Sequence, residues 1–310
     1  MEDSLAAVRP VAKAHHYNPQ HHLARFTNPS GMLLVYDRHA DPAKMPRSCT
    51  PKNAGFEKWL YAPEDGSAAH HDDTIEVWLA NSVDGPAVEP IDRLIAGKRP
   101  SRAQRKAMAR FVAAQDLRTP SARDWILAEA RRRADQKTAN FGAIRDRIGA
   151  RIRAAGFGLS EQELDRWEKD FASGARRISI DKEFWLDYLE TRINMMAPGL
   201  EELSWSVVRA PATVELVLSD AAVVKSRPGF RESIPYAPGW TKGTEWVFPL
   251  SPSDALRIRQ PGSDSGLTDS DWFQRVNSRA VEQARRAVVA RSPQHWIPGV
   301  FAASRPASIS

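Results

Sequence analysis

The sequence predicts an α+β fold in which a helical middle packs on a mixed or antiparallel sheet formed by an N-terminal strand and C-terminal β segments. Apolar residues recur with helical periodicity through the middle of the chain, from about 74 to 195. Short β-branched and aromatic runs follow, from about 203 to 260, and a similar run, Met32 to Tyr36, precedes the helices. We therefore expect the N-terminal strand and the C-terminal β segments to join.

The chain is predicted to form one interlocked domain. Its 310 residues would allow one large or two ordinary domains, and its 42% hydrophobic and 26% charged residues are ordinary for a globular protein. No internal repeat is visible. We expect a loose leader over 1–14, a single domain over 15–292, and a Pro-containing tail over 293–310.

The first element is predicted to be a short helix over 15–26. Asn18 is a good N-cap, and Pro19 suits the first helical position because its missing N–H would be unpaired there. Leu23 and Phe26 give this helix an apolar stripe. His16 would then lie just outside a helix N-terminus, whose N–H groups favour an anion.

The other elements follow from turn and capping signals. A turn at 28–31 leads into the first strand, and aromatic side chains anchor an irregular loop over 38–73. Ser101 and Gln104 form a capping box, and Thr119 with Pro120 begins another helix. We expect helices over 74–96 (with a break near Gly85-Pro86), 101–117, 119–133, 140–154, 160–173, 181–195 and 269–290, and strands over 205–209, 214–218, 222–225, 246–250 and 255–259.

One polar residue lies where an apolar residue is expected. Met108, Phe111, Val112 and Gln115 are spaced at i, i+3, i+4 and i+7, so all four share one helix face. An amide on such a face is buried, and a buried amide needs a hydrogen-bond partner. We therefore expect Gln115 to bond to another polar group.

Composition narrows the cellular location and the partners. No apolar run is long enough for a membrane span, and the N-terminus lacks a signal-peptide core, so we expect a cytoplasmic protein without membrane contact. The single Cys49 fits a reducing compartment. A net charge of +6 leaves nucleic acid or another anionic ligand open as a partner, although runs of basic residues on helices more often form a solvated face.

Several motifs, in order along the chain, resemble domain-of-unknown-function family 4238. His16, Tyr17, Pro19, Gln20, Leu23 and Phe26 match its opening pattern, and "GMLLVYDR" at 31–38 resembles its first strand. Further matches are Lys52-Asn53, the run from Gln115 to Pro120, Ser219-Asp220, the run from Phe248 to Pro252, and Asn277. The family prefers Glu where this chain has Asp84. The resemblance covers most of the chain and implies no activity, but it marks Lys52 and Asn277 as candidate site residues.

Six polar residues from the start, middle and end of the chain form a candidate site if they converge: His16, Gln20, Gln115, Arg118, Ser219 and Asp220. The resemblance adds Lys52 and Asn277 to them. His16 could exchange a proton near neutral pH, Asp220 could orient it or act as base, and Arg118 could hold a phosphate or carboxylate. We therefore predict His16, Asp220 and Arg118 as catalytic, and Gln20, Gln115, Lys52, Ser219 and Asn277 as substrate-binding. The alternative is that such residues are buried structural groups that bond to one another.

The hypothesis for function is a cofactor-independent hydrolase or nuclease that acts on a phosphate-bearing substrate. The alternatives are a non-catalytic ligand-binding or interaction protein and a small-molecule biosynthetic enzyme. No glycine-rich nucleotide motif is present, so no cofactor is expected. No metal is expected either, because the pairs His15-His16 and His21-His22 lack metal-helix spacing and the cluster from His70 to Asp73 reads as a solvated loop.

Overall fold

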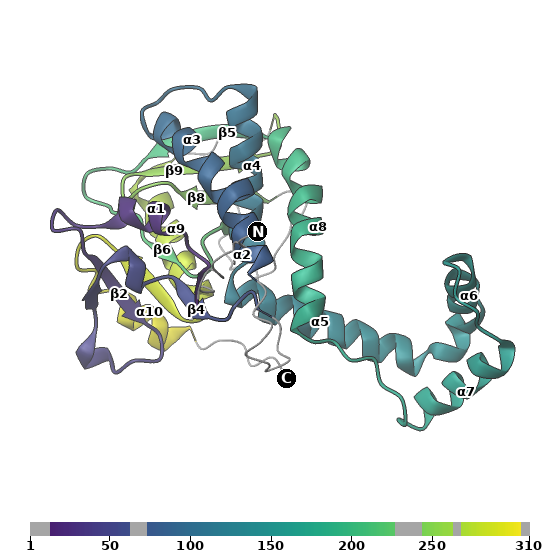
Figure 1. The fold of residues 1–310 in the computed structure, drawn as a ribbon. Helices are drawn as coiled ribbons and strands as arrows, with labels where there is room; N and C mark the ends of the chain where they lie inside the picture. The colour runs from purple at the N-terminus through teal and green to yellow at the C-terminus, as the bar shows by residue number, and fades with distance from the viewer. Residues whose placement is uncertain (1–12, 63–72, 227–243, 263–267, 305–310) are drawn as a thin grey trace, which may run out of the picture.

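A computed structural model describes residues 13–62, 73–226, 244–262 and 268–304 of the chain. It confirms the predicted α+β class and the joining of N- and C-terminal strands in one sheet. Two antiparallel four-stranded sheets lie beside the helices of the body, and a helical arm projects from it (Figure 1). Among the described residues, no helix is both long and apolar enough to cross a bilayer.

The first four-stranded sheet joins the two ends of the chain. Its order is β3-β2-β10-β6, and each neighbouring pair is antiparallel. The register places Val289 of the central strand opposite Val35 on one side and Leu218 on the other. The strands are β2 (Leu33–Asp37), β3 (Arg47–Cys49), β6 (Leu218–Ser219) and β10 (Ala287–Ala290).

The second sheet comes from the predicted β-rich part of the chain. Its order is β5-β9-β8-β7, and a separate two-stranded pair joins β1 to β4 near the N-terminus. Trp246, Phe248 and Leu256 are buried, which explains why these short apolar runs form central strands. The strands are β1 (Ala14–His16), β4 (Phe56–Lys58), β5 (Ser204–Arg209), β7 (Val224–Ser226), β8 (Glu245–Pro249) and β9 (Asp254–Arg259).

In the body, α4 packs against α3 and α8, and α9 packs against α10. Ser101 and Gln104 make the predicted capping box of α4: Ser101 Oγ accepts from Gln104 N at 3.2 Å, and Ser101 N donates to Gln104 Oε1 at 2.9 Å. The predicted break near Gly85 is a π-helical turn (Ala80–Asp84) that joins two helices without a gap. The body helices are α1 (Gln20–Leu23), α2 (Thr74–Leu79), α3 (Gly85–Ile95), α4 (Arg102–Leu117), α8 (Lys182–Glu201), α9 (Ser270–Gln283) and α10 (Ile297–Ala303).

The arm consists of the outer part of α5 (Pro120–Ala139) with α6 (Phe141–Ala154) and α7 (Glu161–Ala172). Figure 1 shows α5 leading away from the body and α6 and α7 forming the far end. Leu164 and Phe141 are buried there, whereas Phe157 and Ile178 are exposed. The arm therefore has only a small apolar core of its own.

The predicted first helix and last helix both differ from the structure. His15 and His16 lie in strand β1, and α1 begins after Pro19, because the Asn18 side chain donates to the Ser219 carbonyl (3.0 Å) instead of capping a helix. The helix predicted over 269–290 ends at Gln283, and its last residues form β10.

The segment predicted as a C-terminal tail contains α10. Ile297 and Phe301 of this helix are buried and belong to the same hydrophobic cluster as Phe273 of α9. The helix is therefore anchored to the body by apolar side chains. Most of the predicted leader lies outside the described residues, and only Lys13 and Ala14 of it are described.

Candidate functional site

Buried polar groups gather where the C-terminal end of α4 meets the segment from β1 to α1. Gln115 is fully buried on the apolar face of α4, as its spacing predicts. With its amide oriented to suit both neighbours, it accepts from Arg118 Nε at 2.9 Å and donates to Asn18 Oδ1 at 3.2 Å. The partner expected for Gln115 is thus Asn18 on one side and Arg118 on the other.

Arg118 ends α4 with a guanidinium that is completely shielded from solvent. Its Nη1 pairs with Asp84 at 2.9 Å, and its Nε donates to the Tyr17 carbonyl at 3.0 Å. Asp84 is the last residue of the π-helical turn, a rare geometry that is frequent at functional sites. Burial raises the pKa of the Asp84 carboxyl, and the Arg118 charge opposes that rise. Because the guanidinium is engaged by Asp84, Gln115 and the Tyr17 carbonyl, Arg118 holds these groups in position.

Two half-buried histidines lie near Arg118 with an unused ring nitrogen. The Nε2 atoms of His16 and His21 are buried and have no hydrogen-bond partner among the described residues. Burial lowers the pKa of His16, and the backbone of Lys52 opposes that change. Burial, followed by the charges of Arg25 and Arg118, lowers the pKa of His21 to about 4. Both rings are therefore neutral at pH 7, and each Nε2 can accept a proton or a hydrogen bond.

Glu76 of α2 completes this corner. Burial raises its pKa to about 7, while Arg118 lowers it and Asp84 raises it, and its carboxylate is hydrogen-bonded to the backbone of His16. A carboxyl group that titrates near neutral pH is suited to general acid–base chemistry. We define the acid–base corner as His16, His21, Glu76, Asp84 and Arg118.

Sequence reasoning missed Glu76 and His21. Glu76 lies in the helical run "TIEVWL", where an acidic residue usually faces solvent. His21 is one of four histidines within eight residues, and only His16 among them matches the family's opening pattern. The pattern alone carries no signal that separates Glu76 from other surface carboxylates.

Asp220 and Ser219 are tied into the backbone of the first sheet. Asp220 is buried, and its carboxylate accepts from the N–H groups of Arg285 (3.0 Å) and Arg286 (3.2 Å) and from Ser121 Oγ (3.3 Å). Burial raises its pKa to about 6 against these donors. Ser219 Oγ donates to the Ala221 carbonyl at 2.8 Å. No described hydrogen bond connects Asp220 with the acid–base corner, and its contacts favour a structural role.

The other predicted substrate-binding residues lie in two places. Gln20 is exposed at the start of α1, and Lys52 is exposed in the 3-10 turn Pro51–Asn53, whose backbone lies beside the His16 ring. Asn277 of α9 instead bonds to the backbone of the strand region before β6, accepting from Val217 N at 3.1 Å. The structure thus brings His16, Gln115, Arg118 and Lys52 near one corner and places Asn277 at a separate cavity.

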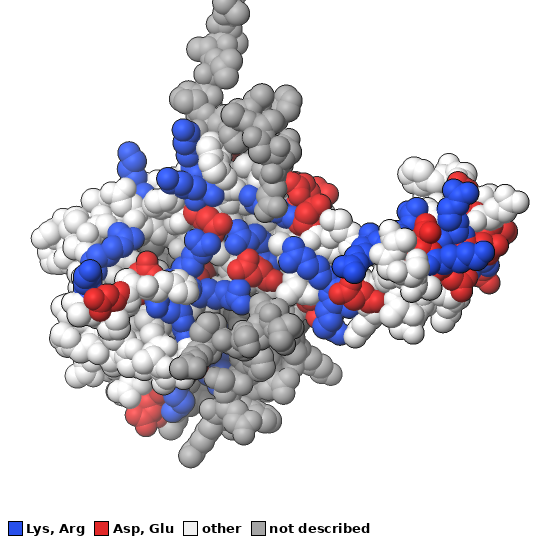
Figure 2. Space-filling model, turned by 90° about the horizontal axis from the view of Figure 1, so that it is seen from below, with Lys and Arg blue, Asp and Glu red and all other residues white. Residues whose placement is uncertain are grey.

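Many of the basic side chains are already paired. Figure 2 shows acidic groups interleaved with the basic ones on the lower face of the body and on the arm. Arg123 and Arg286 both bind Glu57 at 2.7 Å, and Arg285 binds Asp124 at 2.9 Å. The basic groups that Figure 2 draws on this face are thus interleaved with acidic ones. Within the described part of the chain no group of three or more His, Cys, Asp or Glu side chains could hold a metal ion; His70, His71 and Asp72 lie outside it.

Comparison with known proteins identifies the family but no characterised relative. The family model described as "Protein of unknown function (DUF4238)" matches residues 14–294, so the chain belongs to that family, as its motifs indicated. No curated protein and no solved structure matches the chain.

Proposed function

We propose that this DUF4238 member is a cofactor-independent hydrolase of a phosphate-bearing substrate and that the acid–base corner is its active site. The proposal is supported by a neutral histidine whose backbone is hydrogen-bonded to a carboxyl group of raised pKa. His16 has an unused Nε2, and Glu76, with a pKa of about 7, is hydrogen-bonded to the His16 backbone. Enzymes tune such groups toward the working pH because proton transfer is then most effective.

Hydrolysis at this corner assigns one proton-transfer role to each group. His16 Nε2 takes a proton from a water molecule as the water oxygen attacks phosphorus. Protonated Glu76 donates its proton to the leaving oxygen as the phosphorus–oxygen bond breaks. The two groups then exchange the proton through solvent, which restores the starting state. The products are the alcohol and the phosphate group that carries the water oxygen.

Arg118 acts in this proposal as a positioning residue. Its charge is engaged by Asp84 at 2.9 Å and lowers the pKa of both His16 and Glu76. The exposed Lys52, whose own backbone lies beside the His16 ring, supplies a cation for substrate phosphate, and no described side chain pairs with it. Asp220 remains a predicted catalytic residue without a described bond to this corner. We also propose a cytoplasmic location, which the single Cys49 supports because it fits a reducing compartment.

A non-catalytic role is the second candidate, and the hydrogen bonds of four predicted site residues favour it. Gln115, Arg118, Ser219 and Asp220 all have partners within the protein. If their role is structural, replacing Arg118 lowers stability and the protein turns over no phosphate ester. The assay below distinguishes these cases.

The test is hydrolysis of p-nitrophenyl phosphate, bis(p-nitrophenyl) phosphate and single-stranded RNA and DNA in the presence of a metal chelator. We expect wild-type turnover of at least one substrate and a loss of about 10²-fold or more in His16→Gln and Glu76→Gln. His39→Gln is the matched control, since His39 is bonded at 2.9 Å to the Arg285 carbonyl, outside the corner. Thermal unfolding checks that each variant is folded. No turnover of any substrate, or full activity in folded His16→Gln, would overturn the proposal.

A further inference from the structure

A cavity lies away from the acid–base corner, between α9, the loop before β6 and the start of α10. Its volume is about 670 Å³, within the range of small-molecule sites. Hydroxyl and amide side chains and one large aromatic ring dominate its wall. The lining includes Thr213, Glu215, Gln274, Ser278, Gln294 and Trp296. We propose that this cavity binds a neutral, hydroxyl-rich ligand of the oligosaccharide class.

The charge in the wall is neutralised within the protein. Glu215 binds Arg291 Nε at 2.8 Å and accepts from Ser292 Oγ. Burial would raise the pKa of Glu215, but Ser292 and Arg291 together hold it below its usual value, so the pair stays ionised. A cavity lining without an uncompensated charge favours neither an anion nor a cation. A charged ligand would lose its hydration on entering and would find no group of opposite charge to replace it.

Several polar groups remain available to a ligand. The side chains of Thr213, Gln274 and Ser278 make no hydrogen bond to any part of the chain that the structure describes. Together they offer two hydroxyl groups and one amide, which can both donate and accept. Such groups match the hydroxyl groups of a sugar, which also both donate and accept.

The aromatic ring is held in place before any ligand arrives. Trp296 Nε1 donates to Gln294 Oε1 at 2.9 Å, and Gln294 Nε2 donates to Ser292 Oγ at 3.2 Å. Trp296 keeps 36% of its surface exposed although it is the residue before a helix whose Ile297 is fully buried. An indole fixed at its polar edge offers an apolar surface, which suits the C–H groups of a sugar ring, and its pre-ordering lowers the entropy cost of binding.

The cavity wall is also anchored. Asn277 donates to the Glu215 carbonyl at 2.7 Å and accepts from Val217 N at 3.1 Å, so α9 is fixed to the loop that carries Thr213 and Glu215. This explains the place of Asn277 among the motif residues: it shapes the cavity rather than the acid–base corner.

The test is calorimetric titration of the full chain with maltotriose, cellotriose and chitotriose. We expect saturable binding of at least one trisaccharide, weakened about tenfold or more in Trp296→Ala and in Gln274→Ala. Gln274 is exposed, so its replacement leaves the fold intact even if Trp296→Ala does not fold. Trp167→Ala, on α7 of the arm, is the control and should bind as the wild type does. Binding of none of the three sugars, or equal binding by wild type and folded Gln274→Ala, overturns the proposal.

Discussion

The pKa values of two buried carboxyl groups in the body are shifted in the opposite direction from that of a carboxyl group on the arm. In the body, burial raises the pKa of Glu76 to about 7 and that of Asp220 to about 6. On the arm, hydrogen bonds from Arg132 and Arg133 lower the pKa of Glu129, whose side chain is 21% exposed, to about 2. The surroundings of a carboxyl group, not its residue type, therefore decide whether it can transfer protons near neutral pH.

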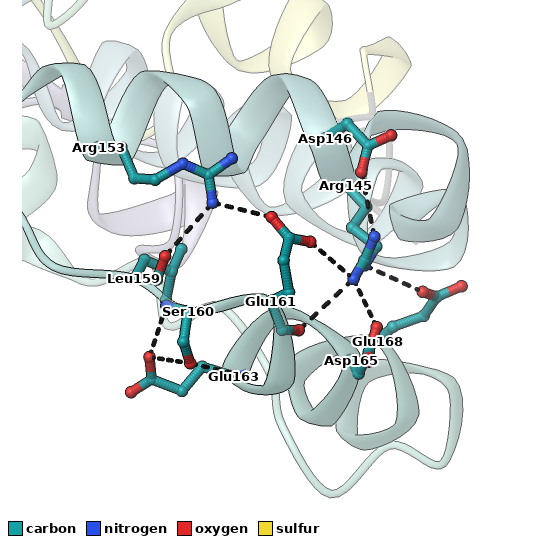
Figure 3. A network of polar contacts seen from close by, with 9 residues as sticks. All are labelled: Arg145, Asp146, Arg153, Leu159, Ser160, Glu161, Glu163, Asp165 and Glu168. Carbon is teal, nitrogen blue, oxygen red and sulfur yellow. Dashed lines mark hydrogen bonds and ion pairs between the residues drawn. The ribbon is translucent and has the colours of Figure 1, made fainter.

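The ion pairs of the body and of the arm also differ in how far they are exposed to solvent. Lys225 and Asp116 pair at 2.7 Å in the body with side chains only 11% and 1% exposed. On the arm, Arg145 faces four carboxylates, Asp146, Glu161, Asp165 and Glu168, that are 46–89% exposed (Figure 3). Water screens the arm network, whereas each partner of the buried pair depends on the other.

Breaking the buried pair should have the largest effect. We expect Lys225→Ala to lower the free energy of unfolding by about 3–5 kcal/mol, because Asp116 would keep a buried charge without its ammonium partner. Urea denaturation measures this. Lys106→Ala, an exposed position on α4, is the control and should change stability by less than about 0.5 kcal/mol. A loss below about 1 kcal/mol in Lys225→Ala would show that the buried pair behaves like the arm network.

The second-largest effect is expected in the pH dependence of stability, which should differ between the body and the arm. The pKa of Glu76 rises from its usual 4.5 to about 7, so the folded protein binds this proton more tightly than the unfolded chain does. The contribution of this tighter proton binding to the free energy of unfolding is fully present below pH 4.5 and is lost as the pH rises toward 7. Glu76→Gln, which cannot ionise, should therefore gain stability relative to wild type over this range, by at most about 3 kcal/mol.

For Glu129→Gln on the arm, the stability difference from wild type should change with pH in the opposite direction. The lowered pKa of Glu129 contributes stability above pH 4.5, and this contribution is lost as the pH falls toward 2. Denaturation curves at pH 4.5, 6 and 8 test Glu76→Gln, and curves between pH 2 and 4.5 test Glu129→Gln. A Glu76→Gln profile parallel to that of wild type would be evidence against the raised pKa.

The smallest effect is expected for Arg145→Ala. Its partners are exposed and water replaces the lost contacts, so the cost should be below about 1 kcal/mol and should shrink further in high salt. Amide hydrogen exchange of α6 and α7 at low and high salt measures it. Arg147→Ala, on the same helix and without a carboxylate partner among the described residues, is the control. A loss of several kcal/mol would mean that the network in Figure 3 holds the arm together.

Elements whose stabilising contacts are local could be predicted from the sequence. The capping box of Ser101 and Gln104 and the cap at Thr119, whose Oγ1 accepts from Ala122 N at 3.1 Å, both form as predicted. The periodic and β-branched runs located most helices and strands within a few residues. The spacing of Gln115 showed that it would be buried and would need a partner.

Strand β10 was missed because its partners are distant in sequence. Val289 pairs with Val35 and Leu218, and Asp220 binds the N–H groups of Arg285 and Arg286, where the sequence predicted a continuing helix. An apolar run such as Ala287–Ala290 is compatible with helix or strand until tertiary contacts decide.

The α+β class, the capped helices and the need of Gln115 for a partner follow from the amino-acid sequence, because they depend on contacts within a few residues or on periodicity. The hydrogen bond of Glu76 to the His16 backbone and the ion pair of Asp84 with Arg118 follow from the fold instead. The same is true of the backbone N–H groups that bind Asp220. Burial and the nearest charge set the state of an ionisable group, and both come from segments far apart in the chain.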